Sequence, residues 1–408
     1  MIIHPKIRGF ICTTAHPVGC AKHVQNQIDY IKSKGPVSGG PKKALIIGAS
    51  TGYGLSSRIV AAFGGSKAAT VGVFFEKPFD GKKTATAGWY NSAAFEQKAM
   101  AAGLYAKSIN GDAFSNEIKQ QAVDMIEKDL GGIDLLVYSL ASPRRVDPKT
   151  GTINKSVLKP IGRSYSNNSI DMSADRLETV TLEAATQEEI DQTVSVMGGE
   201  DWEMWVDILE KNNLLLDGFK TVAYSYIGPE LTRPIYRNGT IGRAKDHLEA
   251  TSKKLDARLK KVKGQALISV NKALVTQSSS AIPFIPLYFI LLSKVMKAQN
   301  VEEGCIEQIY RLFSSVLYGK SKDLIDANGF IRMDNHEMRE DIQKLVESNW
   351  SKVNETTIKD LADLDGYHKN FLTLFGFGLE GVNYDADVDP DVPLPSNTIK
   401  GTVSPFLQ

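Results

Sequence analysis

The sequence predicts an α/β protein built on a doubly wound parallel sheet, with a large insertion and helical additions at the C-terminal end. Short apolar runs of strand type alternate with longer segments of helical period, which is typical of a parallel sheet covered by helices on both faces. In addition, a glycine-rich turn follows the first apolar run directly, where the chain would pass from a strand into a helix.

Six strands and four crossover helices are expected in order along the chain. The expected strands are residues 44–47, 70–75, 105–109, 133–138, 221–226 and 266–270. The expected helices are residues 55–63, 93–102, 115–130 and 241–260. Each helix has the length that a connection between parallel strands requires. Although 408 residues would suit two or three domains, the alternation fits a single enlarged domain over residues 1–408.

Three regions lie outside this alternation. Residues 1–40 form an N-terminal extension, and residues 142–220 form an insertion, expected to be a partly helical cover over the site because structureless loops of this length are rare. Residues 295–408 form a helical block followed by an acidic, proline-containing tail. We expect the tail to be poorly ordered. The apolar run 281–292 is shorter than the ~20 residues of a bilayer helix, so we expect a buried helix or an apolar wall for a substrate.

Composition argues against several classes of function. Lysine and arginine total 48 and aspartate and glutamate total 47, so the net charge of +1 creates no field that would collect nucleic acid or an anionic membrane. The cysteines Cys12, Cys20 and Cys305 are too few for a disulfide framework, and the first residues lack an export signal, so we expect a cytoplasmic protein. No metal site is expected, because the cluster His16, Cys20 and His23 lacks a fourth ligand.

A phosphate-binding loop is predicted after the first strand. Its residues are Gly48, Ala49, Ser50, Thr51, Gly52, Tyr53 and Gly54. Glycines at a strand-to-helix turn expose backbone N–H groups next to the positive end of the helix dipole, so the turn can hold a pyrophosphate. The spacing G-x3-G-x-G differs from the G-x-G-x-x-G pattern of many dehydrogenases, and the alternative is a turn that only reverses the chain.

Further dinucleotide contacts are expected at the ends of the next three strands. The second strand ends at Phe75, and Glu76 follows it. A carboxylate at this place can accept hydrogen bonds from an adenosine ribose and would repel a 2′-phosphate, which predicts NADH rather than NADPH. The third and fourth strands are followed by Asp112, Ala113, Leu140 and Ala141. All of these residues fall at carboxyl ends of strands, where ligands of such sheets bind.

Reduction with such a cofactor usually needs a tyrosine that donates a proton and a lysine that binds the nicotinamide ribose and lowers the tyrosine pKa. The common Tyr-x3-Lys spacing begins at Tyr30 and at Tyr318, but neither lies between the fourth and sixth strands, so we interpret both as chance pairs. Tyr236 and Lys245 follow the fifth strand in a Tyr-x8-Lys spacing. Nine helical steps would place them on opposite helix faces, so a turn must intervene, with Thr240 as N-cap of the helix that carries Lys245.

Several long motifs resemble, in the same order, the monomeric trans-2-enoyl-CoA reductases, which include the FabV-type enoyl-acyl carrier protein (ACP) reductases. The motifs are GASTGYGLSSR, VMGGEDWEMW, YSYIGP, YRNGTIGRAKDHLEA and SVNKALVTQSSSAIPFIPLY. The resemblance covers nearly the whole chain and implies a Rossmann-type fold of the short-chain dehydrogenase kind. It also implies NADH-dependent reduction of trans-2-enoyl-CoA or enoyl-ACP in fatty acid or butyrate-type synthesis, by a monomer.

The resemblance assigns roles to individual residues. Tyr236 would be the proton donor, Lys245 the cofactor-binding lysine, and Tyr226 a contact to the thioester end of the substrate. The implied NADH contacts are Gly48, Ala49, Ser50, Thr51, Gly52, Tyr53, Phe75, Glu76, Asp112, Ala113, Leu140, Ala141, Lys245, Leu274, Val275 and Thr276.

Two other functions remain open at this point. A carbonyl reductase of short-chain dehydrogenase type would protonate a substrate oxygen from Tyr236. A non-catalytic NADH-binding sensor would need Glu76 and the glycine loop but neither Tyr236 nor Lys245. The sequence sets neither the acyl length nor the carrier, CoA or ACP, and the tail after Val388 has no assigned role.

Overall fold

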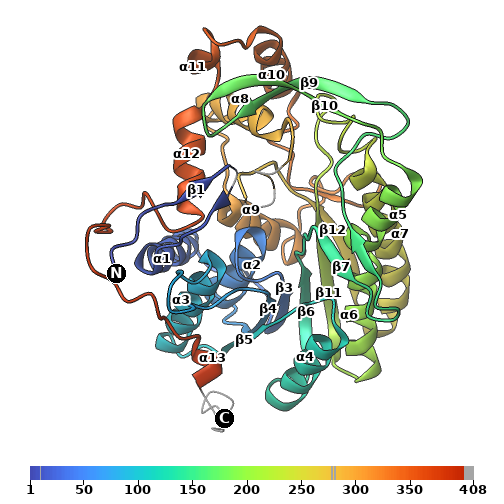
Figure 1. The fold of residues 1–408 in the computed structure, drawn as a ribbon. Coiled ribbons are helices and arrows are strands. Elements are labelled where there is room, and N and C mark those ends of the chain that lie inside the picture. The colour runs from blue at the N-terminus through green and yellow to red at the C-terminus, as the bar shows by residue number, and fades with distance from the viewer. Residues whose placement is uncertain (10, 277–278, 280–281, 399–408) are drawn as a thin grey trace.

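The computed structural model describes residues 1–9, 11–276, 279 and 282–398, and its centre is a parallel sheet of seven strands (Figure 1). The strands are β3 (Lys43–Ile47), β4 (Ala69–Phe74), β5 (Ala106–Asn110), β6 (Ile133–Tyr138), β11 (Leu215–Ser225), β12 (Gln265–Val270) and β13 (Ile331–Arg332). Their order is β13-β12-β11-β6-β3-β4-β5, so the chain starts in the middle of the sheet and winds first to one edge and then to the other. The predicted doubly wound fold is confirmed. The expected number of strands was one too low, because β13 has only two residues.

Helices cover both faces of the sheet (Figure 1). One face carries α1 (Pro17–Lys34), α2 (Gly52–Phe63) and α3 (Ala87–Ala101), and the other carries α4 (Asn116–Asp129), α6 (Glu200–Lys211) and α7 (Thr240–Leu259). Successive residues of β3 alternate between the two cores: Ala44 and Ile46 pack into the first, and Leu45 and Ile47 into the second. Because both faces of the strand are buried, it is apolar at each of these positions, which explains the continuous run in the sequence.

The N-terminal extension and the insertion contribute smaller elements. These are the hairpin β1 (Ile7–Arg8) and β2 (Ile11–Cys12), the hairpin β7 (Arg144–Val146) and β8 (Ile153–Lys155), the hairpin β9 (Tyr165–Asp171) and β10 (Arg176–Leu182), and α5 (Gln187–Met197). The insertion ends before the predicted residue 220, because β11 begins at Leu215. Its helix α6 buries Trp202 and Trp205 in the second core and so belongs to the cover of the sheet. That the rest of the insertion covers the site stays a prediction.

The apolar run 281–292 forms most of a buried helix, α8 (Ile285–Ala298). The β9–β10 hairpin lies beside this helix, in the upper part of Figure 1. Of the two predicted alternatives the buried helix is confirmed for residues 285–292, whereas Ala281 lies outside the described residues. Within the ranges that the structure describes, no helix combines the length and apolarity needed to cross a bilayer.

The C-terminal block is helical, as its periodicity predicts. Its elements are α9 (Cys305–Arg311), a π-helical turn (Leu312–Leu317), α10 (Glu340–Lys352), α11 (Ile358–Leu361), α12 (Leu364–Thr373) and α13 (Pro395–Thr398). Outside this block, a further short element, the 3-10 turn Lys260–Val262, ends α7. Helices α10 and α12 pack against α8, so the block completes the first core rather than forming a core of its own.

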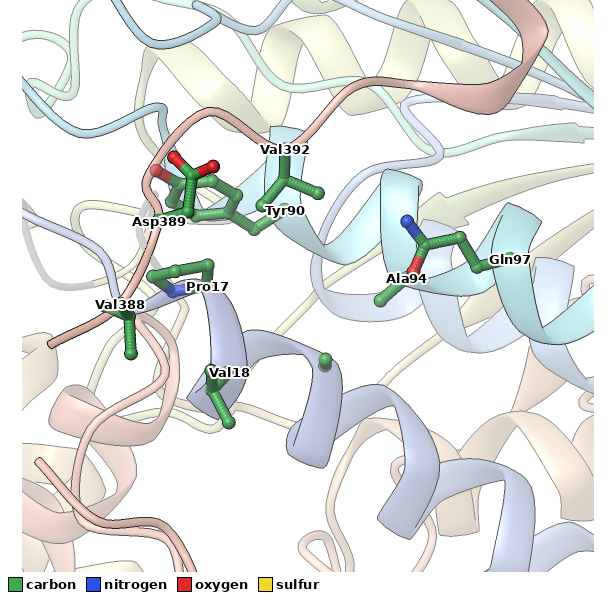
Figure 2. Close-up of a pocket in the computed structure, with 9 residues that line it drawn as sticks. Pro17, Val18, Tyr90, Ala94, Gln97, Val388, Asp389 and Val392 are labelled. Carbon is green, nitrogen blue, oxygen red and sulfur yellow. The ribbon is translucent and has the colours of Figure 1, made fainter. Parts of the chain in front are cut away.

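The tail was predicted to be poorly ordered, and for residues 388–396 this prediction was wrong. The Pro390 carbonyl accepts a hydrogen bond from the Tyr90 hydroxyl at 2.7 Å, and the Val392 carbonyl accepts one from Trp89 Nε1 at 2.8 Å. Figure 2 shows Val392 next to Tyr90. Both residues line a cavity of about 340 Å³. The side chains of α3 therefore fix the tail through its backbone, which its polar composition does not reveal. Residues 399–408, also part of the predicted tail, lie outside the described residues.

A buried ion pair joins α6 to α4 on the face of the sheet that carries the second core. Lys119 Nζ donates to Asp201 Oδ1 at 2.6 Å, and the Tyr138 hydroxyl donates to Asp201 Oδ2 at 3.0 Å. The same ammonium group also donates to the carbonyl oxygens of Ala113 and Phe114, both at 2.9 Å. Both charged side chains are almost fully buried. This network ties the insertion to the end of β5, where Ala113 is a predicted cofactor contact.

Removing the Asp201 carboxylate is expected to destabilise the fold strongly. Asp201→Ala would leave the Lys119 ammonium and the Tyr138 hydroxyl buried without their partner, at a cost of about 3–5 kcal/mol in the free energy of unfolding. Asp207→Ala, on the same helix, breaks only a half-exposed pair with Arg258 and should cost less than about 1 kcal/mol. Urea unfolding of both variants measures the difference. Equal losses for the two variants would contradict this interpretation of the buried pair.

Candidate active site

Close backbone approaches shape the glycine loop between β3 and α2. Gly48 has a φ of 82°, and a Cβ at this position would lie 1.8 Å from the Ser139 carbonyl oxygen. A Cβ at Gly54 would lie 1.9 Å from the Gly48 carbonyl oxygen. Thr51, the N-cap of α2, makes no side-chain hydrogen bond to the first turn, so the N–H groups of this turn remain available to an anion. The loop therefore fits a pyrophosphate better than a turn that only reverses the chain.

Glu76 lies beside this loop. The Ser50 hydroxyl donates to Glu76 Oε1 at 2.7 Å. The Asn110 side chain bonds both backbone groups of Glu76, accepting from its N–H at 2.8 Å and donating to its carbonyl at 2.9 Å. A Cβ at Gly88 would lie 2.0 Å from Glu76 Oε1, so the carboxylate rests against the first turn of α3. Burial raises the pKa of this carboxyl. The neighbouring Phe75 is 78% exposed.

The other predicted cofactor residues follow β5, β6 and β12 at the same edge of the sheet. Ser139, which meets Gly48, is followed directly by Leu140 and Ala141. The Thr276 side chain lies 3.9 Å from where a Cβ of Gly52 would be, which brings the segment Leu274, Val275 and Thr276 to the loop. Asp112 and Ala113 follow β5, two strands away from β3; Asp112 Oδ1 accepts from the Phe114 N–H at 3.0 Å. These placements are compatible with cofactor contacts, and the contacts themselves stay predictions.

Two tyrosines face each other where β11 ends. The rings of Tyr226 and Tyr236 lie 4.9 Å apart, centre to centre, at an interplanar angle of 82°. Tyr236 is buried and Tyr226 is partly buried, and burial is the main reason why the pKa of each hydroxyl is raised. The glycine loop is close by, because its Tyr53 packs edge-on with Tyr224 at 5.8 Å. The structure thus places the two tyrosine rings side by side near the predicted phosphate loop.

Lys245 lies on α7, whose first turn packs against the turn that carries Tyr236. A Cβ at Gly242 would lie 2.0 Å from the Arg237 carbonyl oxygen and 2.7 Å from that of Tyr236. This tight contact fixes the start of α7 relative to Tyr236. Burial lowers the pKa of Lys245 to about 8, and the structure gives its ammonium group no hydrogen-bond partner among the described residues.

The predicted N-cap of α7 was wrong. Gly239 is the N-cap, and Thr240 is already the first helical residue. The Thr240 hydroxyl donates to the Val157 carbonyl instead of capping the helix, and the Thr240 N–H donates to the Lys159 carbonyl at 3.0 Å. A contact with the insertion therefore replaces the local cap, which a reading of neighbouring residues cannot foresee.

Glu337 is the functional candidate that sequence reasoning missed. Its carboxyl is fully buried and accepts from the Tyr226 hydroxyl at 3.0 Å, from the Tyr288 hydroxyl at 2.7 Å and from the Ala273 N–H at 2.7 Å. It stands in the polar segment MDNHEMRE, 111 residues from Tyr226. Nothing in its neighbourhood along the chain marks it as different from a solvent-exposed glutamate.

The residues to which the sequence analysis gave no role in the site, His16, Tyr30 and Tyr318, make contacts elsewhere in the structure. His16 Nδ1 accepts from the Gly19 N–H at 3.1 Å and so caps α1. Among the residues that the structure describes, no three or more His, Cys, Asp or Glu side chains gather as a metal site would require. Tyr30 lies on α1 with the Lys34 ammonium 5.0 Å from its ring centre, and the Tyr318 ring contacts Lys220 at 4.5 Å.

Comparison with known proteins gives the family. Residues 83–318 match the family profile described as the trans-2-enoyl-CoA reductase catalytic region, and residues 2–81 match the NAD(P)H binding domain of trans-2-enoyl-CoA reductase. The chain belongs to the trans-2-enoyl-CoA reductase family. A curated relative, the enoyl-[acyl-carrier-protein] reductase [NADH] of Coxiella burnetii, is 57% identical over 401 residues, which cover 98% of each chain. The corresponding protein of Flavobacterium johnsoniae is 58% identical over 97% of this chain and 100% of its own.

Solved structures of family members agree with the fold. The trans-2-enoyl-CoA reductase of Clostridium acetobutulicum in complex with NADH superposes with a TM-score of 0.93 at 45% identity, over 96% of this chain and 98% of the other. The Treponema denticola enzyme in complex with NAD gives a TM-score of 0.90 at 47% identity, over 95% and 98%. The resemblance that the sequence motifs carry is thereby confirmed, as are the Rossmann-like fold and NADH as the cofactor.

A third profile match concerns a flavin. Residues 325–388 match the family profile described as the enoyl reductase FAD binding domain. In this family member these residues, all of which the structure describes, form β13 and helices α10 to α12 and contain no strand followed by a glycine-rich turn and a helix. Helices α10 and α12 pack against α8. The segment thus contains no turn of the kind that residues 48–54 form between β3 and α2.

Proposed function

We propose that this family member reduces the C2–C3 double bond of trans-2-enoyl thioesters with NADH, in fatty acid or butyrate-type synthesis. The observation that carries the proposal is the pair Tyr226 and Tyr236, 4.9 Å apart between ring centres, next to the loop that fits a pyrophosphate. Two neighbouring hydroxyl donors suit the oxygen of a thioester on which negative charge develops. A binding protein without catalysis has no need of such a pair.

The cofactor fits the observed cradle. The bare backbone at Gly48, Gly52 and Gly54 and the uncapped first turn of α2 would hold the pyrophosphate, and Glu76 would accept from the adenosine ribose. Lys245 would donate to the nicotinamide ribose. When bound, NADH supplies a hydride for C3 of the enoyl group. The remaining predicted contacts are Ala49, Ser50, Thr51, Tyr53, Phe75, Asp112, Ala113, Leu140, Ala141, Leu274, Val275 and Thr276.

The chain itself contributes charge stabilisation and a proton. Negative charge accumulates on the thioester oxygen during the reduction, and hydrogen bonds from Tyr226 and Tyr236 stabilise this charge more strongly than they stabilise the ground state. The raised pKa of both hydroxyls keeps them protonated at neutral pH, so both can donate. Tyr236 is the proposed proton donor of the reaction. Its proton is replaced from solvent after each turnover.

Glu76 is expected to set the preference for NADH. Glu76→Gln keeps the hydrogen bond with Ser50 but removes the negative charge, so it should raise kcat/KM for NADPH by roughly tenfold or more, since one like-charge contact is worth about 1–2 kcal/mol in partly buried surroundings. Ser50→Ala is the control, because it removes the hydrogen bond and leaves the charge. An absorbance assay at 340 nm with either cofactor compares the variants. An unchanged NADPH rate in Glu76→Gln would refute this role.

The proposed function is tested by NADH consumption with crotonyl-CoA, longer enoyl-CoA and enoyl-ACP. Consumption with any of them, and none with the matching saturated thioester, supports the proposal, and the relative kcat/KM values identify the carrier. Activity on ketones alone would favour the carbonyl reductase. Tight NADH binding without turnover on any enoyl thioester would favour the sensor.

We further propose a cytoplasmic monomer without nucleic-acid partners. Cys12, Cys20 and Cys305 are free thiols, as expected in a reducing compartment. The net charge of +1 is too small to attract a polyanion such as nucleic acid. Light scattering of the purified protein measures the oligomeric state; a dimer mass that persists on dilution would contradict the monomer.

A further inference from the structure

The buried Glu337 carboxyl lies behind the proposed active site and touches one of its tyrosines. Its Oε1 atom is 3.0 Å from the Tyr226 hydroxyl and 2.7 Å from the Tyr288 hydroxyl, and its Oε2 atom accepts from the Ala273 N–H at 2.7 Å. Glu337 itself has no access to solvent. A buried acid in hydrogen-bond contact with the substrate-binding tyrosine must influence where the proton of that tyrosine points.

The protons in this cluster can be counted. A tyrosine hydroxyl has one proton to donate. If Glu337 is ionised, Tyr226 gives its proton to the carboxylate, and its oxygen turns only lone pairs toward a thioester oxygen, which also carries only lone pairs. Tyr226 could then not stabilise negative charge on the substrate. The proposed role of Tyr226 therefore requires that its proton be released from Glu337.

The neighbours of the carboxyl leave one arrangement that does this. Gln343 Nε2 donates to the Tyr288 oxygen at 3.1 Å, so Tyr288 must direct its own proton to Glu337. Glu337 Oε2 already accepts a hydrogen bond from the Ala273 N–H. If the carboxyl group is protonated, we therefore expect the proton on Oε1, where it can be donated to the Tyr226 oxygen. A neutral Glu337 then accepts from Tyr288 and Ala273 and donates to Tyr226. Each contact of the carboxyl group then joins one donor to one acceptor.

We propose that Glu337 is a positioning residue that stays protonated and donates to Tyr226, so that the Tyr226 proton is free for the thioester oxygen. This inference rests on the proposed function. The hydrogen bonds form a chain from Tyr288 through Glu337 and Tyr226 to the substrate. Each member donates in the same direction, so the dipoles add toward the oxygen on which charge develops.

The charges around Glu337 are compatible with a neutral carboxyl. Burial is the main cause that raises its pKa. Lys272 would favour the ionised form, but its ammonium group is bonded to Glu302 Oε1 at 3.2 Å and to the Ala273 carbonyl at 3.1 Å. Asp334 favours the neutral form and pairs with Arg332. The other titratable groups that face the carboxyl are Tyr53, Tyr226, Tyr236 and Tyr288.

The test compares Glu337→Gln with Glu337→Ala in the full-length protein. The glutamine amide can donate to Tyr226 and accept from Ala273, so it imitates these two bonds of the protonated acid, but its nitrogen cannot accept the bond from Tyr288. We expect Glu337→Gln to keep kcat within about fivefold of wild type, because the donor is retained. Glu337→Ala should lose about 100-fold in kcat, as for removal of one donor to a developing oxyanion, with KM for NADH unchanged. Glu340→Gln, exposed and three residues away, is the matched control.

The outcomes separate this inference from the function on which it rests. A Glu337→Gln variant as inactive as Glu337→Ala overturns the proposal, because then the carboxylate is needed. Full activity of Glu337→Ala overturns it as well. Tyr226→Phe is measured alongside: if this variant alone keeps the wild-type rate, the role of Tyr226 fails and the inference falls with it. Thermal melting of each variant checks folding, and the glutamine variant, which keeps the size of the side chain and the donor to Tyr226, decides the question if Glu337→Ala does not fold.

Discussion

Tyr236→Phe is expected to lower kcat by about 10²- to 10⁴-fold, the usual contribution of a positioned proton donor. The variant loses only a hydroxyl, and its ring can still pack edge-on against Tyr226 at the observed 4.9 Å. NADH affinity should therefore stay close to that of the wild type. Because the raised pKa keeps this hydroxyl protonated over the neutral range, the loss should not depend on pH between about 6 and 9.

The measurement for this prediction combines initial rates with NADH titrations. Tyr90→Phe is a matched control, since its hydroxyl donates to the Pro390 carbonyl in the tail and not to the site. It should lose stability rather than kcat. A Tyr236→Phe variant with the wild-type rate would show that the proton comes from another group, and Tyr226 would then be the next candidate.

Lys245→Met should weaken NADH binding and reduce kcat together. Loss of a charged donor to the ribose costs about 1.5–3 kcal/mol, or roughly 10- to 150-fold in Kd. The methionine side chain has a similar length, so the packing of α7 is kept. Lys254→Met, exposed on the same helix and paired with Glu203, is the control and should leave Kd unchanged. Isothermal titration with NADH gives both values; an unaltered Kd in Lys245→Met would contradict the assignment.

The same lysine predicts a pH dependence. Burial lowers the Lys245 pKa to about 8, so the ammonium form is present below this pH and is lost as the pH rises through it. NADH affinity of the free enzyme should accordingly fall between about pH 7 and 9. In Lys245→Met this fall should be absent. A fall of the same size in the variant would trace it to a different group.

Local sequence predicted the sheet and the glycine-rich turn between β3 and α2 well. The run at β3 is apolar at successive positions because both of its faces are buried, and Gly48 and Gly54 are needed where backbones approach within contact distance. Such constraints act between neighbours along the chain, so they leave a pattern that can be read. The pair Tyr236 and Lys245 stood out only through its motif, since its spacing alone does not place the two residues together.

The features that the sequence did not predict share a physical cause. Each of them depends on contacts between residues that are distant in sequence. The Thr240 hydroxyl donates to the Val157 carbonyl in the insertion and does not cap α7. The tail is held by Trp89 and Tyr90, about 300 residues away along the chain. Glu337 meets Tyr226 only because the C-terminal block packs against α8. Neither composition nor periodicity carries information of this kind.

The fate of the transferred hydride tests the central claim most directly. The enzyme would convert crotonyl-CoA with NADH deuterated at C4 of the nicotinamide, and NMR would locate deuterium in the product. Conjugate reduction predicts butyryl-CoA with deuterium at C3 only, and a second label at C2 when the solvent is D₂O. Deuterium on the former carbonyl carbon, in an aldehyde or alcohol product, would contradict it and identify a carbonyl reductase instead.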